Sequence, residues 1–249
     1  MAGHSKWANT VHRKTRQDAK KSNVFAKMSR LITLAARDGG GNPDMNPRLR
    51  LIMDKARSAE MPADNIQNAI KRGTGEMEGV NYESAVYEGH GPGGISLMIE
   101  VLTDNKTRTV ADLRRILKVD GGSMSEAGSV TWMFEQKGVL TVPKDKVDYD
   151  ELFMSAVDAG AEDVIEDEDT LEIRTEPRAF QQVYDALRAT GLELERAEVT
   201  YLPTVTKEVN DGDAPKVFKL LDDINDNDDV QQVFSNFDVS DEVLAKLEA

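Results

Sequence analysis

Charge divides this chain into two parts of opposite sign, and the division limits what each part can bury or bind. Residues 1–72 contain 15 Lys and Arg residues against 6 Asp and Glu residues, a balance of +9. Residues 73–249 contain the remaining 16 against 39, a balance of −23, so the whole chain carries −14. This asymmetry predicts a basic module that binds a polyanionic partner, joined to an acidic body that keeps the protein in solution.

The first 21 residues are rich in cations and nearly free of apolar side chains. Residues 1–37 contain nine basic side chains and one acid, Asp18. A segment without apolar side chains cannot bury a core, so we expect an arm that becomes ordered on its partner. The alternative is that these charges only solvate a surface. The candidate nucleic-acid-binding residues lie in this arm and in the helix expected after it: Lys6, Trp7, His12, Arg13, Lys14, Arg16, Lys20, Lys21, Lys27 and Arg30.

Closely spaced cations suit a phosphate backbone, because each neutralised phosphate releases a condensed counterion. Trp7 lies among these cations, and its ring either stacks on an unpaired base or packs back onto the helical module. Two partners stay open. No helix-turn-helix signature with a definable recognition helix is visible for DNA, and a flexible cationic arm equally suits ribosomal RNA.

Helical periodicity begins at Ser22, where apolar residues recur at helical spacing until the glycines at 39–41. A second helix is predicted to start at Asn46-Pro47, where a capping residue precedes proline. Arg48 and Arg50 flank that start. A third helix is predicted from Pro62 to Gly73, so the three helices form a small bundle.

Beyond residue 79 the pattern mixes strands and helices. The sequence predicts strands at 84–89 and 95–102, a helix at 107–119 and a strand at 129–134. Compared with a complete α+β unit of four strands and two helices, this set lacks one helix and one strand. The segment 214–239 supplies both. Between them, 139–203 follows the strand-helix-strand-strand-helix-strand order of a ferredoxin-like unit. The expected fold class is therefore α+β and multi-domain, with an N-terminal helical bundle and two ferredoxin-like α+β domains, one inserted into the other. The expected domains are 1–79, 80–138 plus 204–249, and the inserted 139–203.

Several functional classes are disfavoured by the residues themselves. The chain has no cysteine, which excludes disulfides, zinc knuckles, iron–sulfur clusters and thiol nucleophiles. No apolar run reaches the roughly 20 residues that span a bilayer, so we expect a cytoplasmic protein without a signal peptide and without a membrane partner.

Two short motifs resemble ligand sites but lack features that those sites need. Gly89, Gly91 and Gly94 match a dinucleotide-binding spacing, but a strand follows them where that motif requires a helix. The run 222–230 lacks the glycine and the final glutamate of a calcium loop, so we interpret it as a solvated acidic loop. We therefore expect no cofactor and no metal.

Enzymatic activity is the main alternative function. The carboxylates of 166–172 are interpreted as a charged hairpin tip, because no base or nucleophile converges on them. His4 and His12 lie in the arm, where a phosphate contact is favoured over catalysis. We expect a non-enzymatic protein, with an enzyme using a carboxylate-based site in the acidic domains, or a protein-interaction scaffold, as alternatives.

Four strings of residues point to a known family. The opening MAGHSKWAN, 46-NPRLR-50, 87-YEGHGPGG-94 and 104-DNKTRT-109 occur in order along nearly the whole chain. Together they resemble the YebC/PmpR family, whose members are described as transcriptional regulators and as ribosome-associated translation factors. The resemblance implies three domains around a central cavity and no catalytic activity. It also implies a non-enzymatic regulator of gene expression with DNA or ribosomal RNA as its partner.

Overall fold

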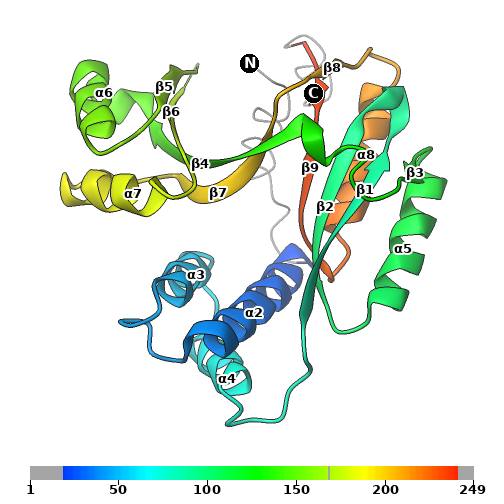
Figure 1. Ribbon diagram of the computed structural model, residues 1–249, viewed down its shortest axis with the longest axis horizontal. Coiled ribbons are helices and arrows are strands. Elements are labelled where there is room, and N and C mark those ends of the chain that lie inside the picture. Colours follow the sequence, from blue (N-terminus) through cyan, green and yellow to red (C-terminus); the bar gives the residue numbers. More distant parts are fainter. Residues whose placement is uncertain (1–18, 168, 241–249) are drawn as a thin grey trace. The chain divides into compact units, whose positions relative to one another are not determined.

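The computed structural model describes residues 19–167 and 169–240, and the chain divides into two compact units (Figure 1). Unit 1 comprises Met1–Thr131 with Thr206–Ala249, and unit 2 comprises Trp132–Val205. Unit 2 therefore interrupts unit 1 in sequence. The expected α+β class is confirmed, whereas the division into 1–79, 80–138 with 204–249, and 139–203 stays a prediction.

Three helices form the helical module at the start of unit 1. They are α2 (Ala19–Gly39), α3 (Pro47–Ser58) and α4 (Ala63–Gly73). Their apolar stripes meet in one cluster that includes Ile32, Leu49 and Ile66. Close approach of α2 and α4 needs a glycine, because a Cβ on Gly73 would lie 2.4 Å from the carbonyl oxygen of Thr33.

Asn46 fixes the predicted start of α3. Its side-chain oxygen accepts from the Leu49 backbone N–H at 3.0 Å, and Pro47 occupies the first helical position. Its amide nitrogen donates to the carbonyl oxygens of Ala35 and Gly40, both at 2.9 Å. One buried amide thus caps α3 and ties it to the end of α2.

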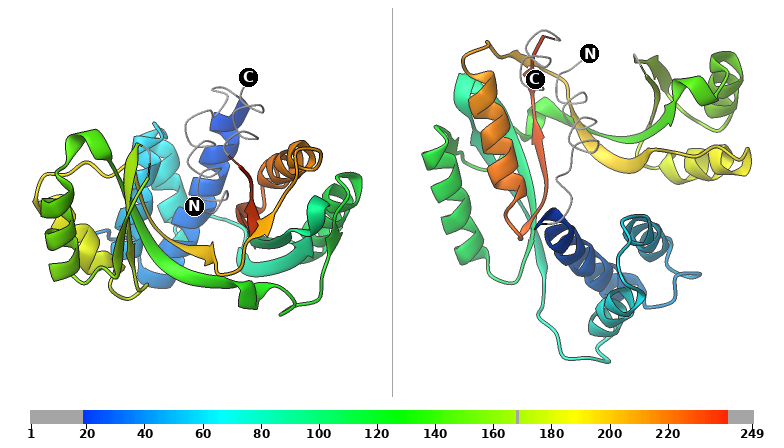
Figure 2. Two further views of the ribbon diagram at one scale, coloured as in Figure 1. Left: turned by 90° about the horizontal axis from the view of Figure 1, so that it is seen from above. Right: turned by 180° about the vertical axis from the view of Figure 1, so that it is seen from behind.

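Unit 1 also contains a four-stranded antiparallel sheet in the order β3-β1-β2-β9. The strands are β1 (Glu83–His90), β2 (Ser96–Thr103), β3 (Ser123–Met124) and β9 (Val230–Ser235). Helices α5 (Lys106–Val119) and α8 (Ala214–Asn225) lie side by side on one face (Figure 2). The apolar residues of these elements form a single core. A short parallel pair, β8 (Lys207–Glu208) and β10 (Phe237–Asp238), completes the unit.

The expected return of the C-terminal segment to this sheet is confirmed. Strand β9 pairs with β2 in a register that places Ser235 opposite Leu97. The turn between β1 and β2 contains a single 3-10 turn, Pro92–Gly94, and Gly93 has φ 71°. A hairpin therefore joins these strands, and no helix follows the glycines. Together with α5 and α8, this sheet has the four strands and two helices of a ferredoxin-like unit. Its first two strands, however, follow each other directly as a hairpin, with no helix between them.

Unit 2 has the expected strand-helix-strand-strand-helix-strand order. Its elements are β4 (Phe134–Pro143), α6 (Tyr149–Asp158), β5 (Asp163–Glu166), β6 (Thr170–Thr175), α7 (Phe180–Ala189) and β7 (Arg196–Pro203). The sheet order is β5-β6-β4-β7, all antiparallel, with α6 and α7 on one face (Figure 2). This is the ferredoxin-like arrangement.

The predicted strand at 129–134 is wrong. Residues Thr131–Met133 form a 3-10 turn, and β4 begins at Phe134. The buried carboxylate of Glu88 explains the difference. It accepts from the backbone N–H groups of Gly128 and Val130 at 2.6 Å and of Thr131 at 3.1 Å. These amides are therefore not available to a strand ladder.

Burial disfavours the charged form of Glu88, but the N–H groups of Gly128 and Val130 and the Thr131 hydroxyl outweigh it and lower its pKa to about 2. Because the pKa of Glu88 is lower in the folded state, its ionised carboxylate stabilises the fold at pH values above the unfolded pKa, near 4.5. This stabilisation is lost as the pH falls toward 2.

Glu88→Gln is expected to destabilise unit 1 at pH 7 by on the order of 3 kcal/mol, which follows from that pKa difference. The deficit should shrink as the pH approaches 2, because the wild-type carboxylate is then protonated too. Urea unfolding at several pH values measures it, with the exposed Glu126→Gln as the control. An equal deficit at all pH values, or the same loss in Glu126→Gln, contradicts this account.

Candidate nucleic-acid interface

Helix α2 carries the described part of the predicted binding surface. Lys6, Trp7, His12, Arg13, Lys14 and Arg16 lie outside the described residues. Lys20 and Lys21 lie in the first turn of α2, and Lys27 and Arg30 lie six and nine residues beyond Lys21. The C-terminal half of α2 is buried against α3 and α4 through Ile32, Ala35 and Ala36. This packing fixes the direction of the helix that follows the arm.

The middle of α2 lies against the loop 225–229 of the same unit. Asn23 donates from its amide to the Asp226 carbonyl oxygen at 3.1 Å, and the Lys27 Nζ donates to the Asn225 carbonyl oxygen at 2.5 Å. Arg30 Nη1 lies 3.3 Å from Asp229 Oδ1, and its guanidinium lies 5.7 Å from the centre of the Tyr82 ring. Lys27 and Arg30 therefore hold α2 against the loop 225–229.

Asp229 is the centre of this contact. It is buried, and its carboxylate accepts from Thr109 Oγ1 at 2.7 Å, Thr103 Oγ1 at 3.2 Å and Arg108 Nη2 at 2.9 Å. Burial raises its pKa, but the hydrogen bonds from Arg108 and Thr109 and the charges of Arg108 and Arg30 outweigh that effect and lower it. The carboxylate is therefore ionised at neutral pH, as its two arginine partners require.

The interpretation of 222–230 as a solvated acidic loop is wrong at Asp229. Residues up to Asn225 belong to α8, and Asp229 is only 4% exposed. The string 104–109 supplies its partners, since Arg108 and Thr109 come from α5 and Asn105 caps that helix by accepting from the Arg108 N–H at 3.1 Å. This motif therefore has a structural role that spacing alone did not reveal.

A cleft of about 790 Å³ opens beside this contact. Seven aspartates and three arginines line it: Asp104, Asp112, Asp120, Asp223, Asp226, Asp228, Asp229, Arg30, Arg108 and Arg115. Arg108 is already paired with Asp104 and Asp229. The excess of carboxylates gives this cleft a negative charge that repels phosphate.

Other cations of the helical module are exposed. Arg48 is 57% and Arg57 61% exposed at their side chains, although each lies near an aspartate. Arg50, Lys71 and Arg72 are also exposed. Of these, the sequence pattern indicated only Arg48 and Arg50. In sequence, these residues share one signal: each is a basic residue of α3 or α4 at a position that does not belong to the helix's apolar stripe.

The described part of the chain has neither a cluster that could hold a metal ion nor a helix that could span a membrane. Within residues 19–167 and 169–240, no group of three or more His, Asp or Glu side chains is placed to hold a metal ion. No helix within those residues has the length and apolar content that crossing a bilayer requires.

Asp229→Asn is expected to destabilise unit 1 by about 2–4 kcal/mol, because Arg108 and Arg30 keep their charges and lose the buried counter-charge. Chemical unfolding followed by circular dichroism measures the loss, and amide exchange in α2 and α5 locates it. The neighbouring Asp228→Asn, which is exposed, is the matched control. Equal stability of the two variants would show that Asp229 does not hold these helices.

Comparison with known proteins places this fold in a family. Residues 5–76 match the TACO1/YebC protein N-terminal domain, and residues 82–237 match the TACO1/YebC second and third domain. A probable transcriptional regulatory protein of Persephonella marina is 52% identical over 249 residues, covering 99% of this chain and 100% of its own. A relative of the same name from Thermotoga maritima is 51% identical over 253 residues, with full coverage of both chains.

A solved structure agrees with these sequence matches. The crystal structure of a conserved hypothetical protein from Aquifex aeolicus superposes with a TM-score of 0.83 at 40% identity, covering 93% of this chain and 96% of that one. The resemblance seen in the four short strings thus extends over the described fold. This chain belongs to the TACO1/YebC family.

Proposed function

We propose that this chain is a non-enzymatic, cytoplasmic regulator of gene expression that binds the phosphate backbone of a nucleic acid through its basic N-terminal arm. The names of its relatives support a regulatory role. The observation that carries the proposal is the density of charge, nine basic side chains against one acid in residues 1–37.

The structure refines which residues are proposed to touch the phosphates. Lys27 and Arg30 contact the loop 225–229, so we assign them to positioning α2. The proposed phosphate contacts are the arm residues with the first turn of α2: Lys6, His12, Arg13, Lys14, Arg16, Lys20 and Lys21. Trp7 is proposed to stack on an unpaired base, a contact worth about 1–3 kcal/mol per base.

Structured RNA, including ribosomal RNA, is the favoured nucleic acid. Reading the major groove needs a recognition helix, and the sequence shows no helix-turn-helix signature that defines one. Cations on an arm bind backbone without reading sequence. RNA offers such an arm unpaired bases for Trp7 as well as phosphates.

Charge reversal in the arm tests the proposal. If about six phosphates are neutralised, log affinity falls against log salt with a slope near −5 for duplex DNA and −4 for single strands. The triple variant Arg13→Glu, Lys14→Glu, Arg16→Glu should bind more weakly and bring the duplex slope to about −3 or flatter. Trp7→Ala should weaken binding and leave the slope nearly unchanged.

The matched control reverses three exposed cations of unit 2: Lys146→Glu, Arg178→Glu and Arg188→Glu. It changes net charge equally and should retain the slope and most of the affinity. Fluorescence anisotropy at several salt concentrations, with duplex DNA, single-stranded RNA and ribosomes, measures all variants. Equal losses in both triple variants would show that total charge, and not the arm, sets the binding.

Purified protein is expected neither to hydrolyse nucleotides nor to cleave nucleic acid. The carboxylate of Asp223 lies 2.7 Å from Lys219 Nζ, a hydrogen bond that lowers its pKa and leaves it a poor general acid. Phosphate release and nuclease assays check this. Turnover that co-purifies with the protein and disappears in Asp223→Ala or Glu168→Ala would overturn the non-enzymatic assignment.

A further inference from the structure

Helix α6 of unit 2 has an outward face that its own unit does not cover. Leu152 and Ala156 are buried against the sheet. On the opposite side Met154 is 63% exposed and Val157 is 42% exposed. These two residues are three positions apart and therefore neighbours on the helix surface. An exposed apolar pair on the outward side of a helix adds nothing to the core of unit 2.

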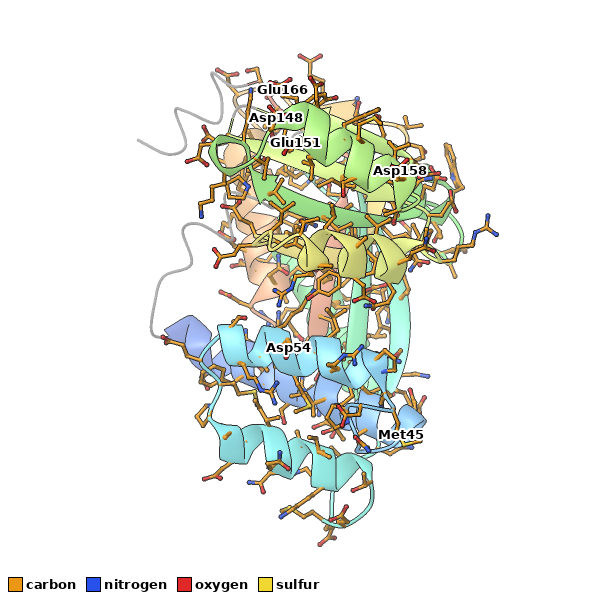
Figure 3. All side chains as sticks on the ribbon, turned by 90° about the vertical axis from the view of Figure 1, so that its left-hand side faces the viewer. Met45, Asp54, Asp148, Glu151, Asp158 and Glu166 are labelled. Carbon is orange, nitrogen blue, oxygen red and sulfur yellow. The ribbon has the colours of Figure 1, made fainter. Side chains whose placement is uncertain are left out.

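Acidic residues surround this apolar pair. Asp150 and Asp158 lie four positions before and after Met154, so both adjoin it on the helix. Figure 3 shows Asp148, Glu151 and Asp158 along α6 and Glu166 on β5. Residues 144–169 contain 11 Asp and Glu residues against 2 Lys, and unit 2 as a whole contains 18 against 7. This excess of negative charge repels a phosphate backbone.

The same helix is held in a fixed conformation. The Asp148 side chain caps it by accepting from the Glu151 N–H at 3.1 Å. Tyr149 stacks on Phe153 at 6.0 Å between ring centres, and its hydroxyl lies 3.5 Å from the Val164 carbonyl oxygen. A partner that binds here meets a preformed surface and does not have to order it.

We propose that the α6 face, formed by Tyr149, Asp150, Glu151, Met154, Val157 and Asp158, docks a Lys- and Arg-rich segment of a partner protein. The partner places an apolar side chain against Met154 and Val157 and its cations against the flanking carboxylates. Charge complementarity selects this partner over an acidic protein or a nucleic acid. Methionine suits such a contact, because its flexible side chain adapts to partners of differing shape.

Methyl NMR of the full chain, labelled at its methionines, provides the test. The probe is a synthetic amphipathic helix with Lys and Arg on its polar face and Leu on its apolar face. It should shift the Met154 methyl signal and leave that of Met45, which is 81% exposed in unit 1, in place. A scrambled peptide of the same composition and an oligolysine of equal length should bind at least about fivefold more weakly, since neither presents an apolar face.

Variants separate the apolar and the charged parts of the surface. Met154→Ser should weaken binding of the amphipathic peptide about fivefold or more, whereas Met45→Ser should not change it. Asp150→Lys with Asp158→Lys should weaken binding about tenfold or more and remove most of its salt dependence. Asp185→Lys with Glu193→Lys makes the same change in charge elsewhere on unit 2 and should retain most of the binding.

Three results overturn the proposal. The first is a Met154 signal that no basic peptide moves, and the second is an equal loss in the two charge-reversal pairs. The third is a Met154 signal that moves when residues 1–18 are deleted, which would make the chain's own arm the occupant. Nucleic-acid binding by the Met154→Ser variant is measured alongside peptide binding. If peptide docking fails while nucleic-acid binding is retained, the docking surface is wrong and the proposed function is not.

Discussion

The buried carboxylate of Asp229 joins elements that lie far apart in sequence. It receives Arg108 and Thr109 from α5, Thr103 from the end of β2 and the charge of Arg30 from α2. A buried charge is stable only with such partners, so each of these residues is needed where it is. Through Arg30 the contact also orients the helix that follows the arm. One buried side chain thus links α2 to the α/β part of unit 1.

Charge segregation suits the two proposed surfaces to different partners. The basic arm attracts phosphate, and the acidic cleft and the α6 face repel it. A particle built from RNA and basic proteins offers a partner to both kinds of surface. The acidic body also limits non-specific binding to polyanions, because only a small part of the chain carries net positive charge.

Local signals predicted most of the fold. Asn46-Pro47 begins α3 because capping and proline act within one turn, and the ferredoxin-like order of unit 2 follows from its alternating patterns. The strand expected at 129–134 was wrong because the Glu88 side chain, some 40 residues earlier, takes its amides. For the same reason, the sequence pattern indicated Asp229 as solvated and did not reveal its contact with Arg30. Their pairing spans about 200 positions and has no local signature.

Crosslinking in living cells tests most directly the central claim that the basic N-terminal arm binds RNA. The experiment identifies both the peptide and the nucleic acid in each crosslink. Ultraviolet crosslinking followed by mass spectrometry locates the crosslinked peptide, and sequencing identifies the nucleic acid attached to it. We predict peptides from residues 1–37, with Trp7 among the crosslinked positions, attached to structured or ribosomal RNA. Crosslinks confined to the glycine turn at 89–94, to 104–109 or to unit 2 would contradict this claim.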